Sequence, residues 1–200
     1  MATGVDEYDL LQQWVRWDRL HLVFDPWAGS GATQAALGSL CPVVLTDVVQ
    51  RSPRLAALAN AVEPADMERV VQAFGRPDAV VASPFFLMND LALPSAIALA
   101  TAAVFLHVRG DYVLDAPPAR RAYLSGLAAA QRLVILAGSQ RNPTLGKRLV
   151  WVAVFASAHQ RQRLLRPSAG FIPLVFGPDA PRHARLPVPL PRRPAAGGGG

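Results

Sequence analysis

Two short apolar runs, each ending in an aspartate, constrain the fold of this chain more than any other feature. The first run covers residues 21–25 and the second covers residues 43–47. Between them lie a turn with two glycines, at residues 26–31, and a stretch compatible with a helix, at residues 32–39. This order of strand, turn, helix and strand is typical of a parallel sheet, because parallel strands need a long crossover connection.

The same alternation continues to residue 155. An amphipathic helix over residues 7–20 precedes the first strand, and we expect it to pack against the edge of the sheet. Further helices are expected at residues 53–60, 67–74, 94–100 and 117–131. Further strands are expected at residues 79–82, 102–109, 133–137 and 149–155. Apolar strands that alternate with helices predict an α/β fold, doubly wound around a mostly parallel sheet.

An uncharged run at residues 91–108 is long enough to raise the question of a membrane span. It contains proline, serine, threonine and histidine, so we interpret it as a buried helix followed by a buried strand, with His107 as a core histidine. The N-terminus begins with acidic residues rather than with a basic patch, and no signal peptide is expected. Cys41 is the single cysteine and the four histidines are scattered, which predicts an intracellular protein, cytoplasmic or nuclear, that binds no metal. The interpretation of residues 91–108 as a buried helix and strand predicts no membrane partner.

The length of 200 residues is typical of one domain. We expect that domain to cover residues 1–165. Residues 166–200 are rich in proline, arginine and glycine, cannot bury a core, and are expected to form a disordered tail or a linker to other domains of a longer polypeptide.

Charge is divided unevenly along the chain. Residues 1–119 carry 7 arginines and 13 acidic residues, whereas residues 120–200 carry 13 basic residues and one acidic residue. A basic half of this kind favours contact with a polyanion such as nucleic acid, with DNA preferred over RNA. The alternative is a compositional bias toward arginine, which outnumbers lysine 19 to 1.

The turn at residues 25–31, Asp-Pro-Trp-Ala-Gly-Ser-Gly, has the position of a ligand-binding loop. Ligands of open parallel sheets bind beyond the carboxyl ends of the strands, where a glycine turn lets the ligand approach the backbone. The turn lacks the Gly-Lys-Ser/Thr of a phosphate loop, and Gln34 replaces the third glycine of a dinucleotide fingerprint. Asp47 ends the next strand, at about the 20-residue offset where an acid binds ribose hydroxyls.

Residues 25–33 resemble the Asp-Pro-Phe-x-Gly-Ser-Gly-Thr/Ala-Thr element of the DNA amino-methyltransferases. The resemblance implies the seven-stranded, Rossmann-like sheet of class I methyltransferases and S-adenosyl-L-methionine as the cofactor. It implies that Asp47 binds the ribose and that Asp66 lines the adenine pocket, the alternative for Asp66 being an N-cap of the helix that follows. The cofactor-binding residues so implied are Asp25, Pro26, Trp27, Ala28, Gly29, Gly31, Asp47 and Asp66.

A second element, Ser83-Pro84-Phe85-Phe86, follows the strand at residues 79–82 and resembles the Asp/Asn/Ser-Pro-Pro-Tyr/Phe motif of the same enzymes. An exocyclic amine is a poor nucleophile, so a side-chain oxygen and a backbone carbonyl must accept its two hydrogens. The resemblance implies that Ser83 supplies the oxygen, Pro84 the carbonyl and Phe86 a face for an extruded base. Phe85 stands where the family has its second proline.

The residues expected to contact the substrate are Phe85, Arg141, Lys147 and Arg148, and Arg120 and Arg121 are further basic candidates. The resemblance covers residues 21 to about 156 and predicts transfer of a methyl group to an exocyclic amine of a nucleic-acid base, adenine N6 in DNA first. One alternative is a catalytically degenerate binding module within a larger protein. Another is a methyltransferase for RNA, protein or a small molecule on the same fold.

Overall fold

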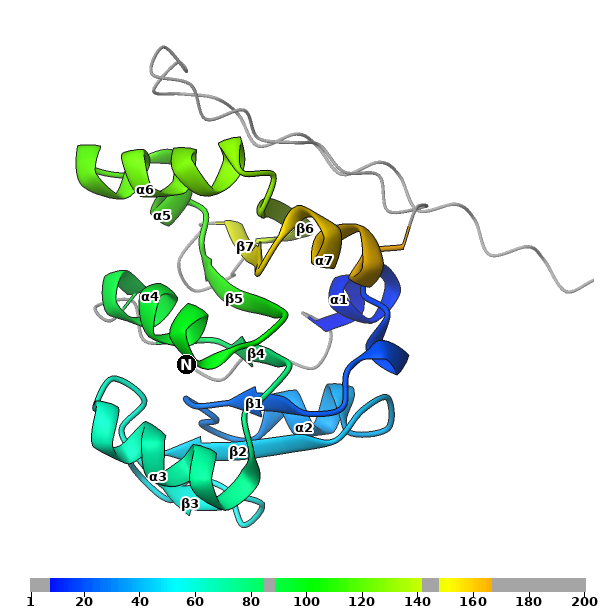
Figure 1. Cartoon of the computed structure of the whole chain (residues 1–200), viewed down its shortest axis with the longest axis vertical. Coiled ribbons are helices and arrows are strands. Elements are labelled where there is room, and N and C mark those ends of the chain that lie inside the picture. Colours follow the sequence, from blue (N-terminus) through cyan, green and yellow to red (C-terminus); the bar gives the residue numbers. More distant parts are fainter. Residues whose placement is uncertain (1–7, 85–88, 142–147, 167–200) are drawn as a thin grey trace, which may run out of the picture.

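A computed structural model describes residues 8–84, 89–141 and 148–166 of the chain. These residues form a seven-stranded sheet with the order β3-β2-β1-β4-β5-β7-β6 (Figure 1). The strands are β1 (Val23–Asp25), β2 (Val43–Asp47), β3 (Ala57–Leu58), β4 (Ala79–Ala82), β5 (Ala103–Arg109), β6 (Leu133–Arg141) and β7 (Arg148–Phe155).

All neighbouring strands from β3 to β5 are parallel. β7 is antiparallel to both of its neighbours, β5 and β6, and is therefore the one reversed strand in the described ranges. The carboxyl ends of β1, β2, β3 and β4 therefore meet at one edge of the sheet, which we call the carboxyl edge. Asp25 pairs with Leu45 in the register of β1 and β2, so that β2 extends two residues further, to Asp47, at this edge.

Helices cover both faces of the sheet. They are α1 (Asp9–Trp14), the short 3-10 helix η2 (Trp17–Arg19), α2 (Ala32–Leu37), α3 (Pro64–Phe74), α4 (Asn89–Leu99), α5 (Asp111–Leu114), α6 (Pro118–Ala129) and α7 (Ala158–Leu164). Figure 1 shows α1 and α7 on one side of the sheet and α4 and α6 on the other. Two separate apolar clusters result: one joins α1, α2 and α7 to the sheet, and the other joins α3, α4, α5 and α6 to it.

The uncharged run at residues 91–108 forms most of α4 and β5, as expected, and all but the last residue of β5 are buried. Within the residues that the structure describes, no helix is both long and apolar enough to cross a membrane. His107 lies buried in β5, and its ring stacks on Trp151 with centroids 4.5 Å apart. Burial lowers its pKa to about 4, so the imidazole is neutral at physiological pH.

The helix expected at residues 53–60 does not form, and this prediction is wrong. The segment instead contains turns and β3, whose residues Ala57 and Leu58 pair with the end of β2. The backbone N–H groups of Ala56 and Ala59 donate to the carbonyls of Leu45 and Asp47, at 2.8 and 2.9 Å. Pairing with a neighbouring strand therefore outweighs the local helical preference of the alanine-rich sequence.

The N-terminal segment also differs from expectation, because it packs on a face of the sheet rather than on its edge. The expected single helix over residues 7–20 is divided into α1 and η2. The ring of Tyr8 lies 5.1 Å from that of Trp151, and Trp17 lies 5.7 Å from Phe105. Both partners belong to interior strands of the sheet, β7 and β5, and their large aromatic side chains bury much apolar area against the N-terminal segment.

Candidate functional site

The candidate site lies at the carboxyl edge, where the turn after β1 meets the ends of β2 and β4. The turn is closed by two backbone hydrogen bonds, from Ala28 N to Thr46 O at 3.1 Å and from Gly31 N to Ala28 O at 2.7 Å. The first bond ties the turn to β2, and the second leads into α2. The two aspartates and the turn are therefore brought together as the sequence predicts.

Gly29 and Gly31 occupy left-handed backbone conformations, with φ of +52° and +83°. This conformation is strained for other residue types, which explains why glycine is found there. A Cβ atom on Gly31 would lie 3.1 Å from Ser52 Oγ and 3.3 Å from Leu45 Cδ1, so this position is crowded. Among the residues that the structure describes, a Cβ atom on Gly29 would meet only Trp27 O, at 4.0 Å, so they leave the backbone there open to a ligand.

Asp47 links β2 to the turn. Its Oδ2 accepts a hydrogen bond from Gly29 N at 2.8 Å, and its Oδ1 accepts one from Val49 N at 3.2 Å. A carboxylate has about four acceptor positions, so each oxygen keeps one for a ligand hydroxyl. The next residues, Val48 and Val49, are about half exposed and present apolar side chains to solvent beside the carboxylate.

Asp25, which is predicted to bind the cofactor, is buried at the end of β1, with 3% of it exposed. Its Oδ1 accepts from Trp27 N at 3.1 Å and its Oδ2 from the Thr33 hydroxyl at 2.5 Å. Burial raises the pKa of Asp25 to about 7, and the charge of Asp47 acts in the same direction, against the two hydrogen bonds. The buried carboxyl of Asp25 therefore links the backbone of the turn, at Trp27, to the start of α2, at Thr33.

We expect Asp25 to make the stability of the chain fall as pH rises. Its pKa is about 7 in the folded chain and 3.8 in the unfolded chain, so between these values the folded chain binds the extra proton. This contribution is fully present below pH 3.8 and is lost as pH rises through 7, at a cost on the order of 4 kcal/mol. Urea unfolding between pH 4 and 8 should show the wild type losing that much relative to Asp25→Asn; parallel profiles would contradict the assignment.

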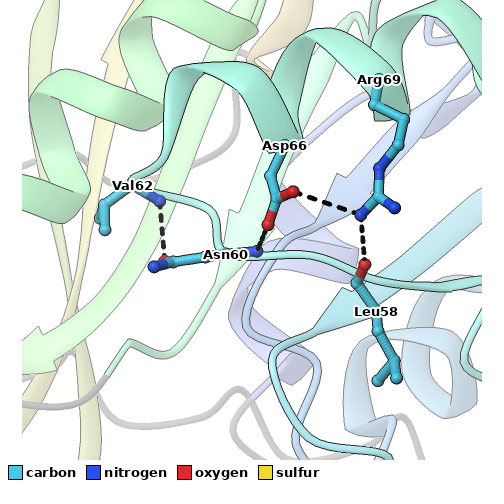
Figure 2. A network of polar contacts seen from close by, with 5 residues as sticks. All are labelled: Leu58, Asn60, Val62, Asp66 and Arg69. Carbon is cyan, nitrogen blue, oxygen red and sulfur yellow. Dashed lines mark hydrogen bonds and ion pairs between the residues drawn. The ribbon is translucent and has the colours of Figure 1, made fainter.

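Asp66 is the third residue of α3 and holds the loop that follows β3 (Figure 2). Its Oδ2 accepts from Asn60 N at 2.6 Å, and its Oδ1 forms an ion pair with Arg69 at 3.3 Å. Arg69 in turn donates to Leu58 O at 2.7 Å. The N-cap alternative for Asp66 is wrong, because α3 begins at Pro64 and its N-cap is Glu63.

Asn60 is a candidate site residue that sequence reasoning missed. It lies just beyond β3 at the carboxyl edge, with its backbone N–H bound by Asp66 and its Oδ1 accepting from Val62 N at 3.2 Å. Its side chain lies along the loop that joins β3 to α3 (Figure 2). The sequence contained a usable signal, a polar residue after an apolar run, but the expected helix over residues 53–60 concealed it.

The second predicted element begins at the end of β4. Ser83 is partly buried and Pro84 is buried, directly after Ala82, so both lie at the carboxyl edge. Phe85 and Phe86 fall outside the described residues, as does Lys147. Arg141 and Arg148 are backbone partners at the adjoining ends of β6 and β7, on the same edge of the sheet.

Two further arginines lie on α6, beyond the end of β5. Arg120 forms an ion pair with Asp90 of α4, with contacts of 2.6 and 2.8 Å, and this pair lowers the pKa of Asp90. Its guanidinium also lies 4.3 Å from the centre of the Tyr112 ring. Arg121, by contrast, lines an open groove of about 590 Å³ between α5 and α6.

Comparison with known proteins identifies the fold. No protein-family model and no curated protein matches the chain. Among solved structures, the chain is similar to the cofactor-bound protein Rv0187 from MTB, with a TM-score of 0.53 and 15% identity over 78% of this chain and 83% of that one. It is also similar to an O-methyltransferase from Bacillus cereus, with a TM-score of 0.48 and 12% identity over 76% and 78% of the two chains.

A third similar structure is the S-adenosylmethionine-dependent methyltransferase NGO1261 from Neisseria gonorrhoeae, with a TM-score of 0.37 and 19% identity over 54% of this chain. The match covers 57% of the Neisseria protein, little more than half of its length. The strand order and the antiparallel β7 are those of the Rossmann-like fold of class I methyltransferases. The chain therefore has this fold, as the sequence predicts.

Proposed function

We propose that this chain is an S-adenosyl-L-methionine-dependent methyltransferase that acts on an exocyclic amine of a nucleic-acid base. The target that we favour is adenine N6 in DNA. The observation that carries the proposal is the meeting of three features at the carboxyl edge. These are the open glycine turn, the Asp47 carboxylate that is bonded to it, and the Ser83-Pro84 segment two strands away from Asp47.

The residues present fit the cofactor. Gly29 leaves its backbone accessible for the methionine end, and Asp47 keeps acceptor positions for the ribose hydroxyls. Val48, Asn60 and the Asp66 network that holds Asn60 would surround the adenine ring. Two buried polar atoms beside the turn, Trp27 Nε1 and Thr46 Oγ1, have no hydrogen-bond partner among the residues the structure describes. Both are therefore available to hydrogen-bond a bound ligand at this edge.

When bound, the cofactor supplies an electrophilic methyl group on a positively charged sulfur. The chain then has to orient the amine, because its lone pair is delocalised into the base. The Ser83 hydroxyl would accept one amine hydrogen and the Pro84 carbonyl the other, which directs the lone pair toward the methyl group. The amine proton is lost after transfer, so the reaction needs no strong base at this position.

Charge supports a nucleic-acid substrate over a small neutral one. The basic half of the chain contributes Arg141 and Arg148 to the carboxyl edge, whereas Arg121 shares the groove between α5 and α6 with Asp115. Phosphate neutralisation by such residues supplies most of the sequence-independent affinity for nucleic acid. The described ranges contain no long insertion for target recognition, so we expect low sequence specificity or a partner domain.

A catalytically degenerate binding module is the second candidate. The observation that favours it is the motif itself, in which Ser83 replaces the more usual aspartate or asparagine and Phe85 replaces the second proline. A neutral hydroxyl accepts hydrogen bonds more weakly than a carboxylate does. Such a module would still bind the cofactor at the turn but would not transfer its methyl group.

The test begins with calorimetric titration of S-adenosylhomocysteine into the full chain, for which we expect micromolar affinity. Methyl transfer to duplex DNA, single-stranded DNA and RNA is then measured for the wild type and Ser83→Ala. Loss of the side-chain acceptor should lower transfer about 100-fold and leave cofactor affinity unchanged, whereas Ser39→Ala, an exposed serine remote from the edge, should change neither.

Each outcome separates the candidates. Transfer that depends on Ser83 supports the enzyme, and transfer to RNA alone would redirect the proposal to an RNA substrate. Cofactor binding without transfer to any nucleic acid supports the degenerate module. A folded wild type that binds no S-adenosylhomocysteine would overturn both.

A further inference from the structure

Three buried side chains connect the N-terminal segment to the cofactor turn. The Tyr8 hydroxyl lies 2.7 Å from Thr33 Oγ1, and Thr33 Oγ1 donates to Asp25 Oδ2 at 2.5 Å. Tyr8 is 1% exposed and Thr33 is fully buried. The three residues come from the start of the described chain, the first turn of α2 and the end of β1, so only the fold brings them together.

When Asp25 is ionised, the donors and acceptors in the series Tyr8, Thr33 and Asp25 are fixed. A threonine hydroxyl carries a single proton. Because Thr33 donates that proton to Asp25, Thr33 must accept from the Tyr8 hydroxyl. Both protons then point toward the carboxylate, which is the arrangement that stabilises a negative charge in a buried place.

Asp25 also fixes the position of the turn backbone. Its other oxygen accepts from Trp27 N at 3.1 Å, two residues before Gly29, so the orientation of the carboxylate governs where the turn backbone lies. Tyr8 is itself held in place by its ring contact with Trp151. A second link between the same segments, from Gln12 Nε2 to Ala36 O at 2.7 Å, involves no titratable group and keeps α1 against α2.

We propose that Tyr8 is a positioning residue of the cofactor site, whose hydroxyl acts through Thr33 to hold Asp25 ionised and the turn in its binding conformation. The inference rests on the proposed function, since a carboxylate beneath the turn favours a cofactor that carries an ammonium and a sulfonium group. It goes further, because it assigns a role in cofactor binding to a residue that lies outside the turn and beneath it.

The role of Tyr8 can be measured through the pKa of Asp25, which depends on the groups around its carboxyl. Asp47 of β2 is the charged group that acts on it among the described residues, and it opposes ionisation, as burial does. The hydrogen bonds from Thr33 and Trp27 favour ionisation. The pKa of Asp25 is about 7, so a weakened Thr33 bond changes its charge near neutral pH.

The first experiment is a carbon-13 NMR titration of the Asp25 carboxyl in the free chain. Tyr8→Phe should raise its midpoint by about one pH unit, and Thr33→Val should raise it at least as far. Thr33→Ser, which keeps the hydroxyl, should retain the wild-type midpoint. Tyr112→Phe removes a buried phenol in the opposite apolar cluster and should leave it unchanged.

The second experiment is calorimetric titration of the same variants with S-adenosylhomocysteine between pH 6 and 9. At pH 7, Tyr8→Phe should bind roughly five- to tenfold more weakly and release more protons on binding, and its affinity should approach that of the wild type at pH 9. A loss of affinity that is equal at every pH would reduce Tyr8 to a structural residue and overturn the inference.

The two readouts separate the failures. An unchanged Asp25 midpoint in Tyr8→Phe overturns the inference even if the wild type binds the cofactor. A shifted midpoint in a chain whose wild type binds no S-adenosylhomocysteine overturns the proposed function, and with it the role of Tyr8 in binding.

Discussion

Replacement of Gly29 by leucine is expected to weaken binding of S-adenosylhomocysteine by more than about 100-fold, with the chain still folded. Gly29 has a φ of +52°, and a Cβ atom there would meet no atom of the described residues nearer than 4.0 Å. The substitution therefore costs the backbone roughly 1–2 kcal/mol, and its Cβ atom clashes with none of the described residues. Its side chain would instead occupy the space through which the cofactor must reach the turn.

Gly75 provides a matched control. It has a φ of +83° and a ψ of 170° at the end of α3, a conformation almost restricted to glycine, and a Cβ atom there would meet no described residue within 4 Å. Gly75→Leu therefore carries a backbone cost at least as large as that of Gly29→Leu, away from the turn. Urea unfolding should show that Gly75→Leu loses at least as much stability as Gly29→Leu, and calorimetry should show a binding defect for Gly29→Leu alone. Equal affinities in the two variants would place the cofactor elsewhere.

Replacement of Trp151 by alanine is expected to lower the free energy of unfolding by about 3–5 kcal/mol. Trp151 is 1% exposed and lies on β7, between the antiparallel partners His107 and Leu136. Its ring contacts His107 on one side and Tyr8 on another. Truncation leaves a cavity that these rings, fixed on separate strands and segments, cannot fill without moving the backbone.

Urea denaturation followed by circular dichroism measures this loss. Phe74→Ala, at the exposed end of α3, removes an aromatic residue that is already 37% exposed and should cost less than about 1 kcal/mol. Because domains are commonly stable by only about 5–15 kcal/mol, Trp151→Ala should unfold at a much lower urea concentration. A loss no greater than that of Phe74→Ala would show that the cluster joining α1 to the sheet is not well packed.

The parts of the site that the sequence predicts are those with local signals. The apolar runs that end in Asp25 and Asp47 are visible as short strands, and the glycines between them mark a turn. Asp47 is expected near that turn, and the structure places it there through its hydrogen bond with Gly29. Ser83 and Pro84 follow β4 as expected, because a proline after an apolar strand marks its end.

Other parts depend on pairing between distant segments. β3 has two residues, too few for any periodicity, and exists only because β2 offers its carbonyls to Ala56 and Ala59. For that reason Asn60 could not be recognised as a residue at the end of a strand. The position of α1 likewise depends on the aromatic rings of β5 and β7, which no local pattern connects to Tyr8.

The α/β class, the glycine turn and the order of the acids along the chain follow from the sequence, because they depend on the alternation of apolar residues and on the backbone freedom of glycine. The depth of Asp25 and the groups that it meets follow only from folding. Tyr8 and Thr33 are 25 residues apart in the chain, and their hydrogen bond to each other exists only once α1 has packed beside α2. Burial and hydrogen bonding act through space, so the charge of Asp25 near neutral pH is a property of the fold.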